Sequence, residues 1–174
     1  MNIKQLALAT AGSLALTASF GSQAQTSLAS CLSTPIVNFE GTVVDAALAT
    51  PALSTLVDAV VAADLVDALN DAEDITVYAP TNDAFGKIPA DITGAILADT
   101  DVLTAVLTYH VTPGMIDPRR YVTPVRRDTL LGQKVFYSRA DSNAMVNNAK
   151  IDCQGVQTDN GMVWVIDSVL IPNF

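Results

Sequence analysis

The chain has 174 residues, of which 50% are hydrophobic, and its 9 Lys+Arg against 18 Asp+Glu give a formal net charge of −9. This length is enough for one domain with a core of its own. The acidic balance disfavours nucleic acid as a partner, because proteins bind nucleic acid mainly by placing cations on phosphates.

The first 24 residues, MNIKQLALATAGSLALTASFGSQA, have the form of a secretory signal peptide. Lys4 supplies the positive start, an apolar run follows, and Ser22-Gln23-Ala24 gives a small-x-small cleavage pattern. The alternative, a membrane anchor, is disfavoured because the run is short and rich in Ala, Ser, Gly and Thr. We therefore predict a secreted, extracellular or periplasmic protein with no transmembrane segment in the mature chain.

A short leader, residues 25–38, follows the signal peptide and contains Cys31. The other cysteine is Cys153, and two cysteines in an oxidising compartment often pair. Such a disulfide would close a loop of about 120 residues. The loss of entropy in the unfolded chain would then stabilise the fold by roughly 4–5 kcal/mol. The alternative is two buried free thiols. The count and spacing exclude a C-x-x-C redox motif or a zinc ligand set.

Helical periodicity dominates residues 42–70. Thr42 can cap a short helix over residues 43–50, and Pro51 opens a longer amphipathic segment. Its apolar residues recur at helical spacing, with a possible break at residues 62–64. The acidic residues lie mostly off the apolar stripe, which indicates a solvated face.

Residues 75–80, ITVYAP, predict a short strand. Thr81 or Asn82 can then cap a short helix, and residues 90–110 have the pattern of two further helices. After residue 110 the helical pattern gives way to short β-type runs, at 122–131, 133–138, 144–148, 149–153, 155–158 and 162–172.

Turn signals separate several of these runs, at Gly132, Asn147-Asn148 and Asn160-Gly161. The strongest is Asn160-Gly161, because both residue types tolerate positive φ. Helices first and strands afterwards indicate an α+β domain rather than alternating βαβ units.

Three stretches together resemble the fasciclin domain family. They are ITVYAPTNDAF with Thr81 and Asn82, LTYHVTPG with Tyr109 and His110, and a third, AKIDCQGVQTDNGMVWVIDSVLIP, with Asn160 and Gly161. The resemblance covers nearly the whole mature chain, and we place the fasciclin domain at residues 39–174.

The resemblance implies a wedge-shaped β-sandwich with several N-terminal helices packed on it. It also implies a single-domain secreted protein of the bacterial kind, without enzymatic activity, that mediates adhesion or contacts with the extracellular matrix or cell surface. The sequence departs from the family in two places. Gly155 and Val156 stand where some animal members carry an integrin-binding Asp-Ile pair, and Trp164 stands where members often have histidine or a smaller residue.

His110 is the only histidine, so a hydrolytic triad would have to use it. No G-x-S-x-G nucleophile motif is present, and metal catalysis usually needs further histidines or a carboxylate cluster. In a helix, His110 continues the apolar stripe of Leu103, Val106 and Leu107 and therefore points inward. We predict a buried, neutral, structural histidine that fastens the helices to the sheet, with a pKa below its unfolded value. We predict no enzyme, cofactor or metal site.

The segment DPRRYVTPVRR is a candidate binding patch. Arg119, Arg120, Arg126 and Arg127, with Tyr121 between the pairs, could hold carboxylates or sulfates of an extracellular protein or polysaccharide. The alternative is that these arginines only offset the acidic half of the molecule, because residues 40–101 hold 12 acidic residues against one basic residue.

A second hypothesis is carriage of an apolar small molecule such as a pigment or lipid, as some fasciclin-like proteins do. Aromatic and sulfur-containing side chains could line a groove, although such residues are more often core: Tyr121, Phe136, Tyr137 and Met145. A hydrolase is a third and disfavoured hypothesis, for the reasons given for His110.

Overall fold

The structure is a computed structural model that describes residues 28–140 and 143–174. The predicted signal peptide, residues 1–24, and the start of the leader lie outside the described residues. Within the described ranges, no helix has the length and apolar character needed to cross a bilayer.

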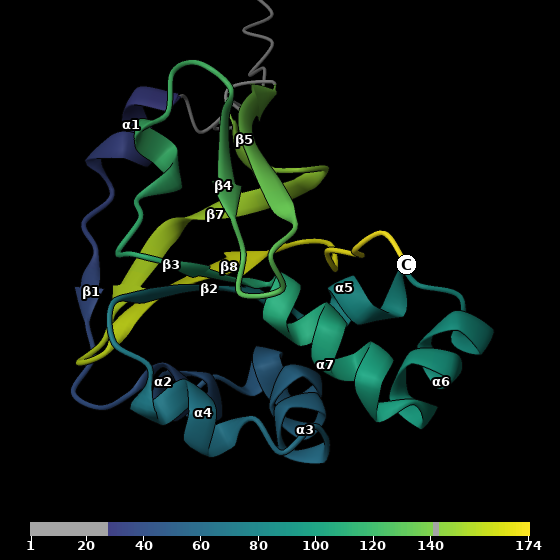
Figure 1. Cartoon of the computed structure of the whole chain (residues 1–174). Coiled ribbons are helices and arrows are strands. Elements are labelled where there is room, and N and C mark those ends of the chain that lie inside the picture. Colours follow the sequence, from purple (N-terminus) through teal and green to yellow (C-terminus); the bar gives the residue numbers. More distant parts are fainter. Residues whose placement is uncertain (1–27, 141–142) are drawn as a thin grey trace, which may run out of the picture.

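Most of the helices precede the main strands in the chain. They are α1 (Leu28–Ser33), α2 (Val43–Leu48), η1 (Pro51–Leu53), α3 (Ser54–Ala62), α4 (Val66–Asp71), α5 (Asn82–Gly86), α6 (Ala90–Ala98), α7 (Thr100–Tyr109) and η2 (Pro118–Arg120). Figure 1 shows α2, α3 and α4 beneath the sheet with α5, α6 and α7 beside them, whereas α1 lies at the opposite end.

Local capping sets several helix starts. Thr42 caps α2 in a capping box with Asp45, in which the hydroxyl accepts from the Asp45 N–H and the carboxylate accepts from the Thr42 N–H. Thr81 accepts from the Ala84 N–H at the start of α5. Both caps confirm the sequence prediction. The predicted break at residues 62–64 is also confirmed, because α3 ends at Ala62 and Asp64 has a φ of 54°.

The strands form one continuous sheet in the order β3-β2-β8-β7-β6-β5-β4, with β1 pairing β7. They are β1 (Val37–Asn38), β2 (Ile75–Pro80), β3 (Val111–Pro113), β4 (Val125–Asp128), β5 (Lys134–Ala140), β6 (Asn143–Val146), β7 (Ala149–Gln157) and β8 (Gly161–Ile166). The central β2–β8 and the β1–β7 pairs are parallel, and the others are antiparallel.

The β-sandwich that the resemblance implies is not confirmed, because the strands form one sheet. The runs 149–153 and 155–158 join into one long strand, β7, whose pairing with β8 shifts register between Ile151 and Gly155. Such an irregularity bends and twists a strand. Because β7 pairs β8 along one part and β6 along another, a single sheet folds over on itself. In Figure 1, β4 and β5 stand over β7, β8 and β2.

Strands β2 and β8 separate two cores because successive side chains point to opposite faces. An aliphatic core lies between these strands and the helices and includes Leu53, Leu56, Val60, Leu107 and Val163. An aromatic core lies inside the folded sheet and is built around Tyr78, Tyr137 and Trp164. Each of these three aromatic side chains is fully buried.

Glycine is needed at position 161 for a reason other than the predicted tolerance of positive φ. Neither Asn160 nor Gly161 has positive φ, which is found instead at residues such as Asn147 and Gly132. A Cβ on Gly161 would lie 2.3 Å from the Ile75 carbonyl oxygen, so glycine is needed here for the close approach of β8 to β2.

Candidate functional site

His110 follows the last residue of α7 and is 2% exposed. Its Nδ1 donates to the Val106 carbonyl at 2.7 Å, and its Nε2 accepts from the Leu170 N–H at 2.9 Å. These two bonds define the neutral tautomer. They join α7 to the segment after β8, so the histidine fastens the helices to the chain beyond the sheet rather than to a strand.

Burial lowers the pKa of His110 to about 4, although the bond to Val106 partly opposes this shift. At neutral pH the ring therefore carries no charge, and its donor and acceptor are both occupied by backbone groups. The ring has no free nitrogen with which to take a proton from a substrate or nucleophile.

Tyr109, the neighbour of His110, links α7 to the hairpin of β5 and β6. Its hydroxyl donates to the Lys134 carbonyl at 3.1 Å and accepts from Asn147 Nδ2 at 2.9 Å. The Oδ1 of Asn147 accepts from the Phe136 N–H at 2.9 Å. The sequence marked Asn147 only as a turn residue, and its side-chain role depends on distant parts of the chain.

Two asparagines of the family motifs hold the helices in place: Asn82 joins the start of α5 to η1 and α3, and Asn160 joins the turn before β8 to α2 and α4. Asn82 accepts from the Thr55 N–H at 3.0 Å and donates to the Pro51 carbonyl at 3.1 Å. Asn160 accepts from the Val43 N–H at 2.9 Å and donates to the carbonyls of Leu69, Asn70 and Ala72. Together with the Thr81 cap, these contacts explain why such side chains stand in the motifs without assigning them any chemistry.

Arg119 does not lie on the predicted binding patch, because it is 3% exposed. Its guanidinium forms a bidentate ion pair with the Asp117 carboxylate, with Nε donating to Oδ1 at 2.9 Å and Nη2 to Oδ2 at 3.0 Å. The same group donates to three carbonyls, those of Cys31, Thr34 and Cys153, and lies 4.8 Å from the centre of the Trp164 ring. Arg119 therefore holds the first described segment of the chain, residues 28–38, against β7. We call this segment the N-terminal arm.

Asp117 compensates the positive charge of the buried Arg119. The sequence analysis did not single out Asp117. Burial opposes ionisation of Asp117, but the hydrogen bonds and charge of Arg119 outweigh it, so the pKa of Asp117 lies below its ordinary value. Asp117 also accepts from the Arg119 N–H as the cap of η2. An Asp before Pro-Arg is a local signal for that cap, whereas nothing local signals the burial.

The N-terminal arm is also held covalently. Cys31 and Cys153 form a disulfide, with a Cα–Cα distance of 4.9 Å, which confirms the predicted pairing. It joins α1 to β7 inside the segment where the register of β7 shifts.

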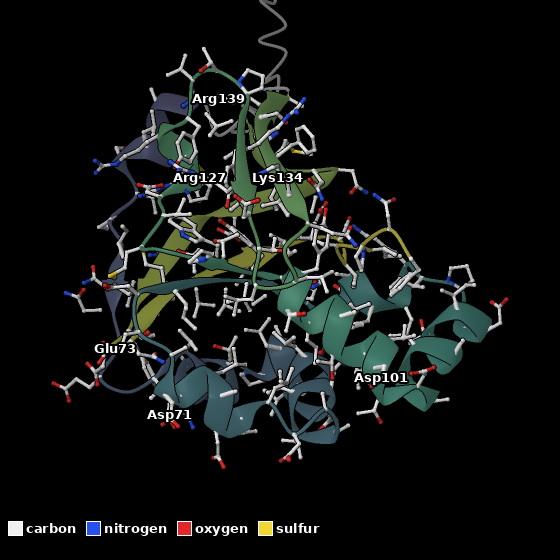
Figure 2. The ribbon with its side chains drawn as sticks, viewed as in Figure 1. Asp71, Glu73, Asp101, Arg127, Lys134 and Arg139 are labelled. Carbon is white, nitrogen blue, oxygen red and sulfur yellow. A yellow bond between two sulfur atoms is a disulfide. The ribbon has the colours of Figure 1, made fainter. Side chains whose placement is uncertain are left out.

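The other three arginines of the predicted patch are exposed, with Arg126 and Arg127 on opposite faces of β4, whereas Tyr121 is partly buried against the aromatic core. Arg126 lies 4.8 Å over the Phe136 ring, and Arg127 donates to the Tyr121 hydroxyl at 3.1 Å. Adjacent strand residues point to opposite faces. Arg120 is 80% exposed in its side chain and bonds Asp117. Figure 2 shows Arg127, Lys134 and Arg139 at the sheet end and Asp71 and Asp101 on the helices.

The residues predicted to line an apolar groove do not share one. Tyr137 points into the aromatic core, where its hydroxyl lies 2.5 Å from that of Tyr78, and Tyr121 stacks on its ring at 5.2 Å. Phe136 and Met145 belong to the other face, since Phe136 adjoins Tyr137 and Met145 pairs with Ser138.

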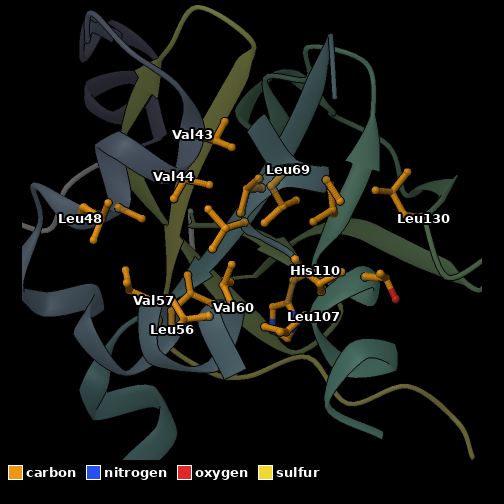
Figure 3. Close-up of a pocket in the computed structure, with 18 residues that line it drawn as sticks. Val43, Val44, Leu48, Leu56, Val57, Val60, Leu69, Leu107, His110 and Leu130 are labelled. Carbon is orange, nitrogen blue, oxygen red and sulfur yellow. The ribbon is translucent and has the colours of Figure 1, made fainter. Parts of the chain in front are cut away.

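A cavity lies elsewhere, within the aliphatic core (Figure 3). It has a volume of about 190 Å³ and is bounded by α2, α3, α4, β2 and the end of α7. Apart from Thr108 and His110, every lining residue is Val, Leu or Ala. Sequence reasoning missed it because its walls have the same helical apolar stripe as any packed core. In residues 28–140 and 143–174, no cluster of His, Cys, Asp or Glu suited to a metal ion is found.

The two departures from the family pattern, at Gly155 and at Trp164, depend on each other because the two residues pack together. Gly155 pairs with Trp164 across β7 and β8. A Cβ on Gly155 would lie 2.6 Å from the Trp164 ring, and the indole N–H donates to the Ile116 carbonyl at 2.9 Å. The large ring on β8 therefore requires glycine on β7.

A sequence model of the fasciclin domain matches residues 51–172. The chain belongs to the fasciclin domain family. This domain is similar to "Protein sll1483" of Synechocystis sp., with 40% identity over 133 residues that cover 75% of this chain and 73% of that protein.

Mycobacterial relatives are also similar. The immunogenic protein MPB70 of Mycobacterium bovis is 42% identical over 63% of this chain, and the cell surface glycolipoprotein MPB83 of the same species is 42% identical over 75%. The chain spans only 55% of MPB70 and 60% of MPB83.

A FAS1 domain pair from the insect cell adhesion molecule fasciclin I shares the fold. The TM-score is 0.56 at 19% identity, with 68% of this chain and 45% of that chain covered. At this identity the likeness concerns the fold alone.

Proposed function

We propose that this fasciclin domain, residues 39–174 after removal of a signal peptide ending at Ala24, is an exported, non-enzymatic module for adhesion to an extracellular protein or polysaccharide. The name of one relative, the cell surface glycolipoprotein MPB83 of Mycobacterium bovis, supports an extracellular role. The occupied ring of His110 supports a role without catalysis.

The observation that carries the proposal is the pair Arg126 and Arg127. Both side chains are exposed, and within the described residues neither is ion-paired to a carboxylate. Each lies on an aromatic ring, Phe136 or Tyr121, which holds the guanidinium in place. Two arginines that serve only to neutralise acids of the same molecule would be expected to contact such acids.

An acidic polysaccharide fits this arrangement. Its carboxylates or sulfates can accept paired hydrogen bonds from a planar guanidinium. The acidic helices lie at the other end of the molecule, so a polyanion would approach the sheet end with little repulsion (Figure 2).

The test is binding of heparin and alginate, as sulfated and carboxylated polysaccharides, over a series of NaCl concentrations. We expect Arg126→Ala/Arg127→Ala to weaken binding roughly tenfold or more. Arg126→Lys/Arg127→Lys keeps the charge but loses the planar donor pair, and should weaken binding less. Lys87→Ala, on the helical side, should leave it unchanged. Salt-independent binding, or none, would contradict the proposal.

A second function, carriage of an apolar small molecule, is favoured by one observation, the aliphatic cavity beneath the sheet. Concave, mostly apolar pockets are the usual sites of small apolar ligands. Uptake of the uncharged fluorescent probe N-phenyl-1-naphthylamine by the purified protein tests this function without naming the natural ligand.

A further inference from the structure

We infer that the cavity between α2, α3 and α4 takes the aliphatic chain of an amphiphile whose head group carries no negative charge. This inference rests on the second proposed function, carriage of an apolar molecule. It adds where the ligand lies, which part of it enters, and which head groups the protein rejects.

The lining of the cavity offers a ligand no hydrogen bond. The two polar side chains among the lining residues are already bonded, His110 to Val106 and Leu170, and Thr108 through its hydroxyl to the Thr104 carbonyl at 2.7 Å. The remaining lining residues are aliphatic and include no aromatic ring. A polar ligand would lose its hydration on entry and gain no bond, whereas a hydrocarbon chain loses nothing.

The mouth of the cavity shows where the rest of a longer ligand would lie. Three lining residues are large and exposed, with Leu48 at 62%, Val61 at 61% and Leu130 at 48%. They continue the aliphatic wall onto the surface, and Figure 3 shows Leu48 and Leu130 at opposite ends of the lining. A cavity of roughly 150 Å³ is enough for benzene. The volume of about 190 Å³ therefore admits a chain end, while the next carbons contact the exposed residues.

The negative charge of the helices that line the cavity decides which head groups the protein accepts. The wall-forming helices carry Asp45 on α2, Asp58 on α3, and Asp67 and Asp71 on α4. None of these helices contains Lys or Arg. Near Leu130, Lys134 is paired with Asp128. A carboxylate or phosphate head group at the mouth would be repelled, whereas an alcohol would not be and an ammonium group would be attracted.

The experiment measures binding of matched amphiphiles to the purified protein by calorimetry and by displacement of N-phenyl-1-naphthylamine. Along the 1-alkanols from hexanol to decanol, each added methylene should tighten binding about fourfold, at about 0.8 kcal/mol per buried methylene. At low ionic strength, decylammonium should bind at least ten times more tightly than decanoate. This difference should shrink in 0.5 M NaCl, because salt screens exposed charges.

Two pairs of variants locate the site. Ala68→Phe places a ring at an exposed lining position on α4 and should abolish binding of decanol, whereas Ala98→Phe, exposed at the end of α6, should not. Asp67→Lys, in the first turn of α4, should restore binding of decanoate. Asp83→Lys is its matched control, in the first turn of α5 and away from the cavity.

The outcomes separate the two claims. If neither alkanols nor the fluorescent probe bind, carriage of an apolar molecule and the inference both fail. If decanol binds and Ala68→Phe abolishes this binding, but decanoate and decylammonium bind equally, carriage stands and the inferred head-group selection is overturned. Binding that survives Ala68→Phe would also overturn the inference, because the ligand would then lie elsewhere.

Discussion

The two cores of this domain, one on each side of β2 and β8, are closed by different means. The aromatic core inside the folded sheet buries Tyr78, Tyr137 and Trp164 completely and gives each polar tip a partner. A buried arginine and a disulfide hold the N-terminal arm across it. The side chains of the aliphatic core, between the sheet and the helices, make no such bonds, and this core retains a cavity of about 190 Å³.

The difference shows how polar groups affect packing. Aliphatic side chains pack without directional bonds, so no bond sets the distance between the helices that carry them. Buried hydroxyl, indole and guanidinium groups each need a partner at a set distance, which fixes the position of the surrounding chain. We therefore expect the sheet side to be sensitive to single changes and the helix side to tolerate them.

Arg119→Ala should have the largest effect. It leaves Asp117 without its partner and removes the donor to three carbonyls, so we expect a loss of about 3–5 kcal/mol in the free energy of unfolding. Chemical denaturation measures it. Arg120→Ala is the matched control, because the exposed Arg120 contacts the same Asp117 and should contribute less than about 1 kcal/mol. Equal losses in the two variants would contradict the role given to Arg119.

The pH dependence of stability tests His110, at the seam between the helices and the chain after β8. Its folded pKa of about 4 lies below the unfolded value of 6.5, so between these pH values the unfolded chain binds more protons. Stability is therefore highest above pH 6.5 and falls as the pH drops to about 4. The total loss is roughly 3 kcal/mol at 1.36 kcal/mol per unit.

Denaturation curves at several pH values, with His110→Gln as the comparison, check this expectation. The variant should lose the slope between pH 6.5 and 4. Asp45, Asp117 and Asp167 also have lowered pKa values, but their contributions are lost mainly below the ordinary carboxylate value of 3.8. Identical slopes in the two proteins would show that His110 does not titrate as its burial implies.

Gly155→Ala should have an intermediate effect. The added Cβ would overlap the Trp164 ring, and overpacking of this kind costs about 1–3 kcal/mol. The same change in a Trp164→Leu background should cost less, because the ring that it meets is gone. A double-mutant cycle of unfolding free energies measures the coupling. Additive effects would mean that the two residues were not selected together by packing.

Val61→Ala should have the smallest effect. Val61 is exposed at the mouth of the cavity, so we expect a change in unfolding free energy within about 0.5 kcal/mol. Val146→Ala deletes the same atoms from the aromatic core and should cost roughly 1.5–3 kcal/mol. Thermal denaturation of the two variants compares an exposed lining residue with a buried residue of the aromatic core, and similar losses would contradict this prediction.

Much of the local structure could be predicted from the sequence. The caps at Thr42 and Thr81, the strand ITVYAP and the inward direction of His110 all follow from residue type and spacing over a few positions. The resemblance to the fasciclin domain also followed from short motifs in order. The candidate site was harder to predict, because arginine is usually a surface residue. Arg119 is buried, although its neighbour Arg120 is exposed.

Local pattern determined most of the helices and strands, the caps at which two helices begin, and that the one histidine lies inside the protein. Tertiary structure alone decided that Arg119 is buried, that a single sheet folds over at β7, and that Gly155 must face Trp164. It also left a cavity among the helices that no residue pattern signals. The physical reason is range: caps and periodicity depend on neighbours within a few residues. Burial, charge pairing and empty volume depend on groups that only the folded chain brings together.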